Sequence, residues 1–464
     1  MLEHLLPSRV FYYFEQLCAI PHGSGNTKAI SDYCMSVAAT LGLDAEQDEY
    51  NNVIIRKAAA PGYESHPTVI IQGHLDMVCE KDADCDLDFE KDGLRLGVDG
   101  DWIYAEQTTL GGDDGIAVAM ALAVLEDKDL PSPAIEALFT TDEETGMDGA
   151  VGLDCSKLQG RILLNADSEE EGVLTVGCAG GARVEARFAL KHAPMQERAY
   201  IVDVSGLRGG HSGVEIDKGR HNANILMGRF LHGLGSPVVC ELGGGSKDNA
   251  IPRSCRAVIM TDADVVSAAE QFMKDNYSEN DPDLVVSVTP TAASEGWQAD
   301  ELIRFLAQVP NGVIDMNADM DGLVETSLNL GILDMKNGCG VCRFSVRSGV
   351  NAKRDALCDR VVALAEHCGA TGRQDGKYPA WEYRKQSPLR DTMVAVYRDL
   401  FDKDPQVLTI HAGLECGLFC EKMPGLDAVS FGPDMRDIHT SRERLSISST
   451  ARTYDYICRI LKEL

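Results

Sequence analysis

About the first 180 residues alternate between short apolar runs and segments with helical periodicity. Apolar runs that fit strands cover residues 68–72, 135–139 and 161–164, and each ends in a cluster of polar residues. Between the first two runs, residues 115–125 are Ala-rich and apolar on nearly every side, which is typical of a helix covered on all faces. Strands that alternate with helices in this way predict crossover connections and a mainly parallel sheet.

The middle of the chain has a different pattern. Alternating apolar and polar residues at 182–190 and 256–260 predict antiparallel strands, with helical segments between them. Near the C-terminus the earlier alternation of helix and strand returns. We therefore expect a discontinuous α/β domain in residues 1–182 and 387–464, interrupted by an inserted α+β domain in residues 183–386.

Composition narrows the class of protein. With 464 residues, 44% of them apolar and 25% charged, the chain fits a soluble globular protein of two or three domains. Its formal net charge of −30 predicts repulsion from nucleic acids and anionic membranes, so we expect neither as a partner. The sequence has no apolar window long enough to span a membrane and no pattern of a secretory signal, which predicts a cytosolic location.

Polar clusters follow the predicted strands at their carboxyl ends, where α/β sheets bind ligands. They occupy residues 73–76, 140–146 and 165–169, and residues 111–115 open the apolar helix. Chance is one explanation, because the chain has 73 acidic residues. However, acids that gather at a partly buried edge repel one another unless a cation offsets them. Carboxylates together with imidazole suit zinc, manganese or cobalt, so the pattern favours a metal site.

Two pairs within these clusters have a suitable spacing. His74 and Asp76 share a face of an extended segment, so Asp76 could accept one ring N–H of His74 while the other nitrogen binds a metal. Glu143 and Glu144 point to opposite sides, which would let one bind metal and the other face a reacting water. Each pair alone is also compatible with an ordinary solvated loop.

Five motifs follow one another along the chain: Gly73-His74-Leu75-Asp76, Gly112-Asp113-Asp114-Gly115, Asp142-Glu143-Glu144-Thr145-Gly146, Asn165-Ala166-Asp167-Ser168-Glu169 and Ile438-His439. In this order they resemble the motifs of the M20-type di-zinc metallopeptidases. Within that family the chain is most similar to the bacterial aminoacyl-histidine dipeptidases. The resemblance covers essentially the whole chain, including residues 209–213 and 249–253 of the predicted insertion.

The resemblance implies two divalent metal ions, zinc first and manganese or cobalt as alternatives. One ion would be held by His74 and Asp167, and the other by Glu144 and His439. Asp113 would bridge the two ions, and the peptide bond that follows it would be cis.

The resemblance also implies the reaction. Asp76 would orient His74, and Glu143 would be the general base that takes a proton from water and returns it to the leaving amine. The substrates would be unblocked dipeptides, Xaa-His included, and the peptide bond would be hydrolysed. The inserted domain would serve as a lid and as the contact surface of a homodimer.

Further residues would contact the substrate. The resemblance implies that His211 reaches the active site of the other subunit and stabilises the oxyanion. Asn249 and Arg253 would grip the substrate, and Arg253 suits a free carboxylate because a guanidinium binds it with two hydrogen bonds. His411 and Glu415 would lie near the substrate amine. For Glu415 the alternative is an acidic residue that stabilises a helix N-terminus.

Two other functions stay open at this level. Relatives with the same ligands act on tripeptides or N-acyl amino acids; Glu415 argues against the N-acyl substrates, because an acyl group presents no cation. The other alternative is an inactive binding protein that keeps the fold. Loss of a ligand or of the base would favour it, but all of these residues are present.

Overall fold

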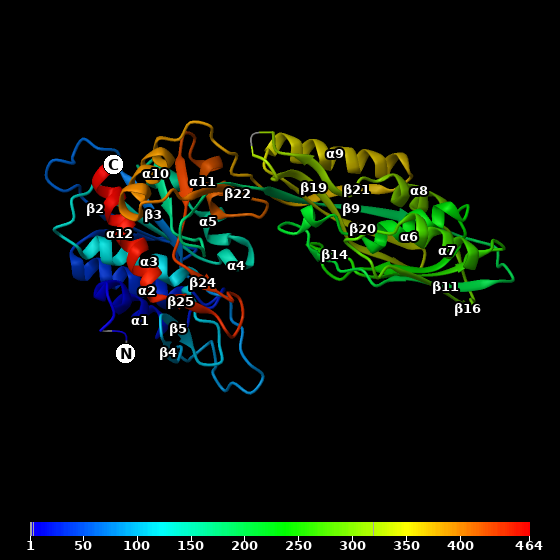
Figure 1. The fold of residues 1–464 in the computed structure, drawn as a ribbon, viewed down its shortest axis with the longest axis horizontal. Coiled ribbons are helices and arrows are strands. Elements are labelled where there is room, and N and C mark those ends of the chain that lie inside the picture. Colours follow the sequence, from blue (N-terminus) through cyan, green and yellow to red (C-terminus); the bar gives the residue numbers. More distant parts are fainter. Residues whose placement is uncertain (1, 3, 319) are drawn as a thin grey trace. The chain divides into compact units, whose positions relative to one another are not determined.

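The computed structural model describes residue 2, residues 4–318 and residues 320–464. Two compact units make up the chain (Figure 1). Unit 1 is built from three segments and unit 2 from two. Unit 1 comprises Met1–Gly177, Tyr383–Thr409 and Leu414–Leu464, and unit 2 comprises Cys178–Glu382 and Ile410–Gly413.

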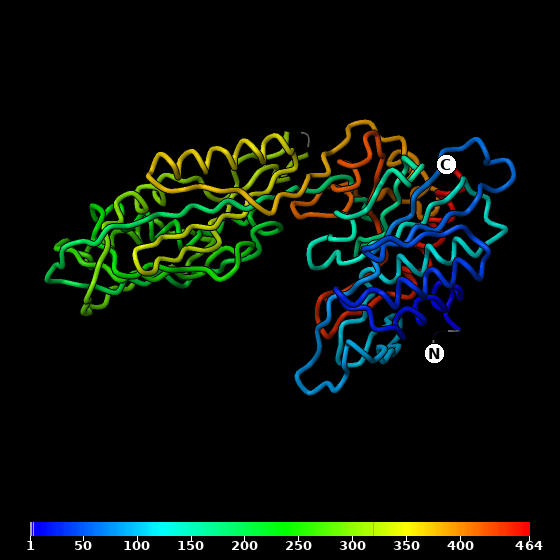
Figure 2. Tube along the Cα trace, turned by 180° about the vertical axis from the view of Figure 1, so that it is seen from behind, coloured from blue at the N-terminus to red at the C-terminus, as the bar shows by residue number. Residues whose placement is uncertain are grey.

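The chain leaves unit 1 once to build most of unit 2 and then returns. The blue N-terminal and red C-terminal segments accordingly belong to the same unit in both views (Figure 1 and Figure 2). The interpretation of the units as a catalytic domain and a lid stays a prediction. None of the described helices combines the length and the apolar composition that crossing a membrane requires.

An eight-stranded sheet forms the centre of unit 1. Its strands lie in the order β1 (Asp44–Gln47), β2 (Val53–Lys57), β6 (Ile135–Thr140), β3 (Val69–His74), β7 (Ile162–Asn165), β23 (Asp427–Ser430), β8 (Val173–Cys178) and β22 (Gln406–Ile410). The central strands β6, β3, β7 and β23 are parallel neighbours, as the crossover pattern predicts. On the two sides, β2 and β8 join this centre as antiparallel strands. The sheet is therefore mixed, with a parallel core.

Unit 1 also contains helices. They are α1 (Ser8–Cys18), α2 (Lys28–Leu41), α3 (Gly112–Glu126), α4 (Glu143–Gly146), α5 (Asp148–Gly152), α10 (Pro388–Phe401), α11 (Glu415–Lys422) and α12 (Ile447–Glu463), with a 3₁₀ turn at Cys155–Lys157. Of these helices, α2, α3, α10 and α11 contact the eight-stranded sheet. Helix α3 contacts β3, β6, α1 and α12, which explains why it is apolar on all sides. Strands β3 and β6 are buried along their whole length, which fits their mainly apolar sequences.

A small antiparallel sheet lies in the same unit. Its strands, in order, are β24 (Met435–Arg436), β25 (Arg444–Ser446), β5 (Trp102–Ala105) and β4 (Leu96–Asp99). The loop between β24 and β25 carries His439. The sheet thus joins this late loop to residues from the first part of the chain.

Unit 2 is an α+β unit, as predicted. Its antiparallel sheet contains β9 (Gly180–Ala189), β10 (Lys191–His192), β11 (Ala199–Ser205), β13 (Val238–Gly244), β15 (Cys255–Met260), β16 (Val285–Thr291), β17 (Trp297–Gln298), β18 (Gly312–Met316), β19 (Val324–Lys336), β20 (Cys339–Ser348) and β21 (Thr371–Tyr378). A separate pair joins β12 (Gly210–His211) to β14 (Ala250–Ile251). The helices are α6 (Ala223–Gly233), α7 (Val265–Asp275), α8 (Asp300–Gln308) and α9 (Asn351–His367), with a 3₁₀ turn at Ile216–Lys218.

The core of unit 2 lies between this sheet and its helices. Phe305 of α8 packs against Phe188 of β9 and Phe344 of β20, with ring centroids 5.4 and 5.9 Å apart. All three side chains are fully buried. Unit 2 therefore has a hydrophobic core of its own.

Candidate metal centre

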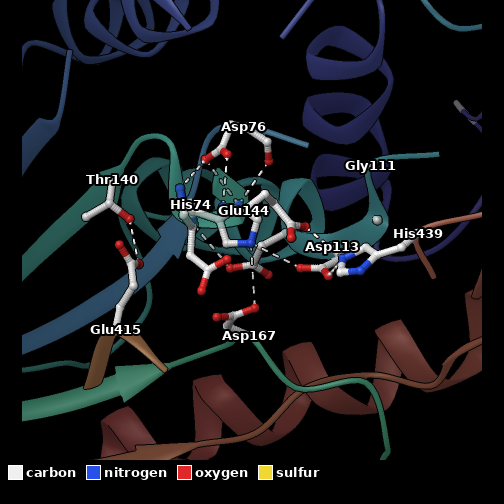
Figure 3. Close-up of polar contacts among 12 residues, drawn as sticks. His74, Asp76, Gly111, Asp113, Thr140, Glu144, Asp167, Glu415 and His439 are labelled. Carbon is white, nitrogen blue, oxygen red and sulfur yellow. Dashed lines mark hydrogen bonds and ion pairs between the residues drawn. The ribbon is translucent and has the colours of Figure 1, made fainter. Parts of the chain in front are cut away.

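Five predicted residues meet in unit 1, beyond the carboxyl ends of the central strands (Figure 3). His74 ends β3, and Asp167 follows β7. Asp113 lies in the first turn of α3, Glu144 in α4, and His439 in the loop between β24 and β25. Segments that are far apart in the sequence thus supply one cluster of side chains.

Asp113 lies between the two imidazoles. Its Oδ1 is 3.1 Å from Nε2 of His74, and its Oδ2 is 3.2 Å from Nε2 of His439. Nε2 of His74 is also 3.7 Å from Oδ1 of Asp167, and Nε2 of His439 is 2.9 Å from Oε1 of Glu144. Potential ligand atoms of His74, Asp113 and Glu144 all lie within 4.8 Å of one another. These potential ligand atoms lie close enough to one another to hold metal ions.

The electrostatics of this cluster indicate a shortage of positive charge. In the described part of the chain, the ion pairs of Asp113, Glu144 and Asp167 involve only the two imidazoles. Burial and the charges of nearby acids raise the pKa of Asp167 well above its usual value. Hydrogen bonds with Asp113 and Glu144 raise the pKa of His439 to about 10. A divalent cation at this place would favour the deprotonated forms of the carboxyl groups and of the imidazoles, in which both can bind a metal.

Asp76 connects His74 to the helix that carries the paired glutamates. Nδ1 of His74 lies 2.9 Å from the main-chain oxygen of Asp76, to which it donates, and 3.5 Å from the carboxylate. The carboxylate accepts the N–H groups of Glu143 at 3.1 Å and Glu144 at 3.3 Å, and the Ser24 hydroxyl at 2.8 Å. The sequence predicted that the Asp76 carboxylate contacts the His74 imidazole. In the structure the main-chain oxygen of Asp76 is nearer to the imidazole than its carboxylate is. The carboxylate instead fixes the start of α4.

Glu143 belongs to neither of the two ligand clusters, whose members are His74, Asp113 and Glu144 in one and His74, Asp114 and Asp167 in the other. Burial raises the pKa of Glu143 to about 8; the nearby charge of His74 opposes this shift and that of Glu415 adds to it. A carboxyl group with a pKa near neutrality can both accept and return a proton.

The implied cis peptide bond between Asp113 and Asp114 is confirmed. Asp114 is fully buried, and its Oδ2 accepts the N–H of His74 at 3.2 Å. Among the described residues its Oδ1 has no hydrogen-bond partner. Burial raises the pKa of Asp114 well above its usual value, which is consistent with a protonated acid beside the cluster.

Glu415 lies in the first turn of α11 and is fully buried. Its Oε2 accepts the hydroxyl of Thr140 at 2.7 Å (Figure 3). It also accepts the side-chain N–H of Gln72 at 2.7 Å. Oε1 has no partner within the described chain. Burial raises the pKa of Glu415 to about 7. Its suggested contact with a substrate amine stays a prediction, and its described hydrogen bonds run to the ends of β3 and β6.

The other predicted substrate-side residues belong to unit 2. Nδ1 of His211 accepts the N–H groups of Gly213 and Val214, each at 3.2 Å, which leaves the proton on Nε2. The main-chain oxygen of Asn249 accepts the N–H of Ser212 at 2.9 Å. Arg253 follows β14, two residues beyond its end. The structure therefore keeps these residues near one another within the β12–β14 region.

His411 also lies in unit 2, although the sequence pattern predicts that it belongs with residues 387–464. Its Nε2 is 2.7 Å from the hydroxyl of Ser327 in β19, and the neighbouring Ile410 oxygen accepts the N–H of Ala179 at 3.1 Å. These contacts explain why the segment packs with unit 2. Burial and the charge of Arg347 lower the pKa of His411 to about 4.

Two further residues of these regions could not be predicted from the sequence pattern. Arg347 is buried in β20, where its Nη1 donates to the Tyr378 hydroxyl at 3.3 Å and its Nε has no partner among the described residues. Glu443 is buried in unit 1, against the loop that precedes α3. Arg347 alternates with apolar residues as any exposed strand residue does, and Glu443 stands between two arginines, which is typical of a solvated turn. Neither pattern indicates a functional site.

Comparisons with known proteins place this fold and cluster among the metallopeptidases, which are hydrolases of peptide bonds. The model of peptidase family M20/M25/M40 matches residues 70–463, and the chain belongs to this family. It is 36% identical to the cytosol non-specific dipeptidase of Escherichia coli (strain K12), over 100% of this chain and 99% of that protein.

Solved structures agree with this assignment. The aminoacylhistidine dipeptidase from Vibrio alginolyticus matches with a TM-score of 0.94 and 35% identity, over 100% of this chain and 98% of that one. The aminopeptidase PepT from Bacillus cereus ATCC 10987 matches with a TM-score of 0.63 and 16% identity, over 99% of each chain. The second likeness extends to the fold alone.

Proposed function

We propose that this chain is a cytosolic metallo-dipeptidase that hydrolyses the peptide bond of unblocked dipeptides, Xaa-His included. The observation that carries the proposal is the cluster of three acids and two imidazoles with no lysine or arginine among its described ion pairs. The names of the relatives in Escherichia coli and Vibrio alginolyticus support the substrate class.

The residues of the cluster fit two divalent ions. His74 and Asp167 would hold one ion, Glu144 and His439 the other, and Asp113 would contact both through its two oxygens. Oxygen and imidazole nitrogen ligands suit zinc, and manganese or cobalt as alternatives. The raised pKa of Asp167 supports this fit, because it reflects a buried carboxyl group beside other acids, whose charge a metal ion would offset.

When bound, such ions polarise the scissile carbonyl and lower the pKa of a water molecule. Glu143 then accepts the proton of the attacking water and delivers it to the leaving amine. Asp76 keeps Glu143 and Glu144 in place through their backbone N–H groups, and it holds the proton of His74 on Nδ1 through its main-chain oxygen. Nε2 of His74 is thereby left free to face the metal.

The substrate-side residues of unit 2 carry the remaining roles. His211 donates from Nε2 to the oxyanion, in the active site of the other subunit of a homodimer. Arg253, with Asn249, binds the free carboxylate of the dipeptide, and buried Arg347 offers a second guanidinium with an unpartnered Nε. His411, together with Glu415 of unit 1, contacts the amine of the substrate. This set of groups suits a substrate with two free ends.

The test is hydrolysis of a small panel by zinc-loaded protein. The panel contains free dipeptides, among them Ala-His and Gly-Gly, an N-acetylated amino acid and a tripeptide. The Glu143→Ala variant and the chelated wild-type protein serve as controls. We expect the zinc-loaded wild type to cleave the free dipeptides and neither of the other two compounds. The two controls should cleave none of the panel. Cleavage confined to the acetylated compound or to the tripeptide would move the enzyme to another substrate class, and no cleavage would support an inactive binding protein.

A further inference from the structure

Glu443 accepts four consecutive backbone N–H groups at the start of α3. Its Oε2 accepts from Leu110 at 2.7 Å and Gly111 at 3.1 Å, and its Oε1 accepts from Gly112 at 2.8 Å and Asp113 at 3.3 Å. The side chain is buried, with 3% of its surface exposed. Both oxygens act only as acceptors in these contacts, which suits an ionised carboxylate.

The backbone at this point is arranged to bind an anion. The first N–H groups of a helix lack partners within the helix and carry a partial positive charge. Gly111 has φ of 66°, in the left-handed region, so the N–H groups on either side of it turn toward the same carboxylate. Gln at position 443 would offer one acceptor oxygen and would place an NH₂ group against the remaining N–H donors.

The contacts join two ligand-bearing loops. Glu443 lies four residues after His439, and its own N–H donates to the main-chain oxygen of Thr440 at 3.1 Å. Through the four donors it fixes the backbone of Asp113, whose carboxylate faces both imidazoles. One side chain that is not itself in the ligand clusters therefore sets the relative position of His439 and Asp113.

We propose that Glu443 is a positioning residue that holds the Asp113 carboxylate between His74 and His439, and thereby sets the affinity of the centre for metal. This inference rests on the metal centre proposed above. Without the carboxylate, buried N–H groups of the loop would lack partners, and the loop would shift to reach water or other acceptors. A metal centre tolerates such a shift of its ligands poorly, because coordination distances are narrowly fixed.

The test compares Glu443→Gln with a matched variant, Glu136→Gln. Glu136 has 2% of its surface exposed and accepts the N–H groups of Gln159 at 3.0 Å and Gly160 at 2.9 Å. It lies near the start of β6, at the end of the strand opposite to the cluster. It is therefore a buried acid that, like Glu443, accepts backbone N–H groups; it also pairs with Arg56 at 3.7 Å, and it has no link to the centre. Zinc affinity is measured on full-length chelated protein by competition with a chromophoric chelator, and folding is followed by circular dichroism.

We expect Glu443→Gln to bind zinc about 10 to 100 times more weakly than wild type, the usual effect of losing a group that orients a ligand. Glu136→Gln should bind zinc as wild type does, even where its unfolding temperature falls. Equal zinc affinity for Glu443→Gln and wild type, within a factor of two, would overturn the inference. An equal loss of affinity in both variants would overturn it too, because it would indicate a general effect of stability.

A second variant covers the case in which Glu443→Gln does not fold. Glu443→Asp keeps the charge and withdraws it by one methylene, so it should fold and bind zinc several-fold more weakly than wild type; unchanged affinity would contradict the inference. Wild-type protein is titrated alongside. Failure of wild type to bind zinc would count against the proposed function itself, whereas normal binding by wild type and by both Glu443 variants would remove only the role of Glu443.

Discussion

Buried carboxylates occur in both units, and the chain treats them differently. In unit 2, Glu185 has 4% of its surface exposed and pairs with Arg187 at 2.6 Å, Arg343 at 2.8 Å and Arg373 at 3.2 Å. Burial alone would raise the pKa of Glu185, yet the hydrogen bonds from Arg343 and Arg187 lower it below its usual value. Here the chain itself supplies the cations.

In unit 1 the acids meet without arginine or lysine. Asp113, Glu144 and Asp167 have only imidazoles as described ion-pair partners, and the pKa of Asp167 is raised. Because buried carboxylates without enough positive charge are costly, we expect the unit 1 cluster to take up cations from outside the chain. The contrast distinguishes a structural ion-pair network from a metal centre, although both consist of gathered acids.

The largest expected effect comes from removing one of the proposed metal ligands of unit 1. His74→Ala removes a ligand that faces both Asp113 and Asp167, so the protein should lose bound zinc, and activity should fall to that of the chelated enzyme. Metal analysis of the purified variant measures this. His192→Ala, at an exposed histidine of unit 2 that stacks on Trp297, is the control and should keep its zinc. Full occupancy in His74→Ala would exclude His74 as a ligand.

Glu143→Ala should separate chemistry from metal binding. Glu143 lies outside the ligand clusters, so the zinc content should stay near wild type while kcat falls by about 10² to 10⁴, the usual contribution of a general base. Steady-state kinetics and metal analysis on the same preparation test both parts. A variant as active as wild type would refute the role of this residue.

Asp167→Asn should act in opposite directions on the two forms of the protein. Burial and neighbouring acids raise the pKa of Asp167. The metal-free wild type therefore loses stability as pH rises through that pKa and the carboxyl group becomes charged. Asn carries no charge, so the metal-free variant should be more stable than the metal-free wild type. Zinc at 100 times its dissociation constant should add about 3 kcal/mol per site to the stability of wild type and less to the variant. Urea unfolding at neutral pH, with zinc and with chelator, measures both. The same response to zinc in both proteins would contradict the account.

Glu185→Gln should have the smallest effect and no dependence on zinc. Its arginine partners are half-exposed and can be solvated, so we expect a loss of about 1 to 2 kcal/mol at neutral pH. Because the folded-state pKa of Glu185 is lowered, its contribution exists above the unfolded pKa and is lost as pH falls through the folded one. The difference from wild type should therefore shrink in acid. A zinc-dependent difference would mean that the two clusters are not separate.

The sequence was sufficient where the structure is local and periodic. The apolar runs that became β3, β6 and β7 end in polar residues, and the carboxyl ends of parallel strands must lie at one edge of a sheet. Helix α3 was recognisable because a helix covered on all sides is apolar on all sides. The position of acids at the sheet edge follows from these two patterns.

The remainder depends on contacts between distant segments. His439 reaches Asp113 from a loop 326 residues away, and periodicity does not indicate that approach; the resemblance did. Glu443 stands between arginines that suggest a solvated turn, and its partners are backbone N–H groups, which leave no trace in side-chain patterns. The burial of Glu415 against Thr140 and Gln72 likewise arises only when α11 packs on the sheet.

We propose that ions from outside the chain offset the acids of unit 1. Crystals of zinc-loaded wild-type protein, measured at the zinc absorption edge, test it directly through anomalous difference maps. We predict two peaks, one beside His74 and Asp167 and one beside Glu144 and His439, with Asp113 within coordination distance of both. A map with no peak near Asp113, or with zinc only at other sites, would contradict the claim.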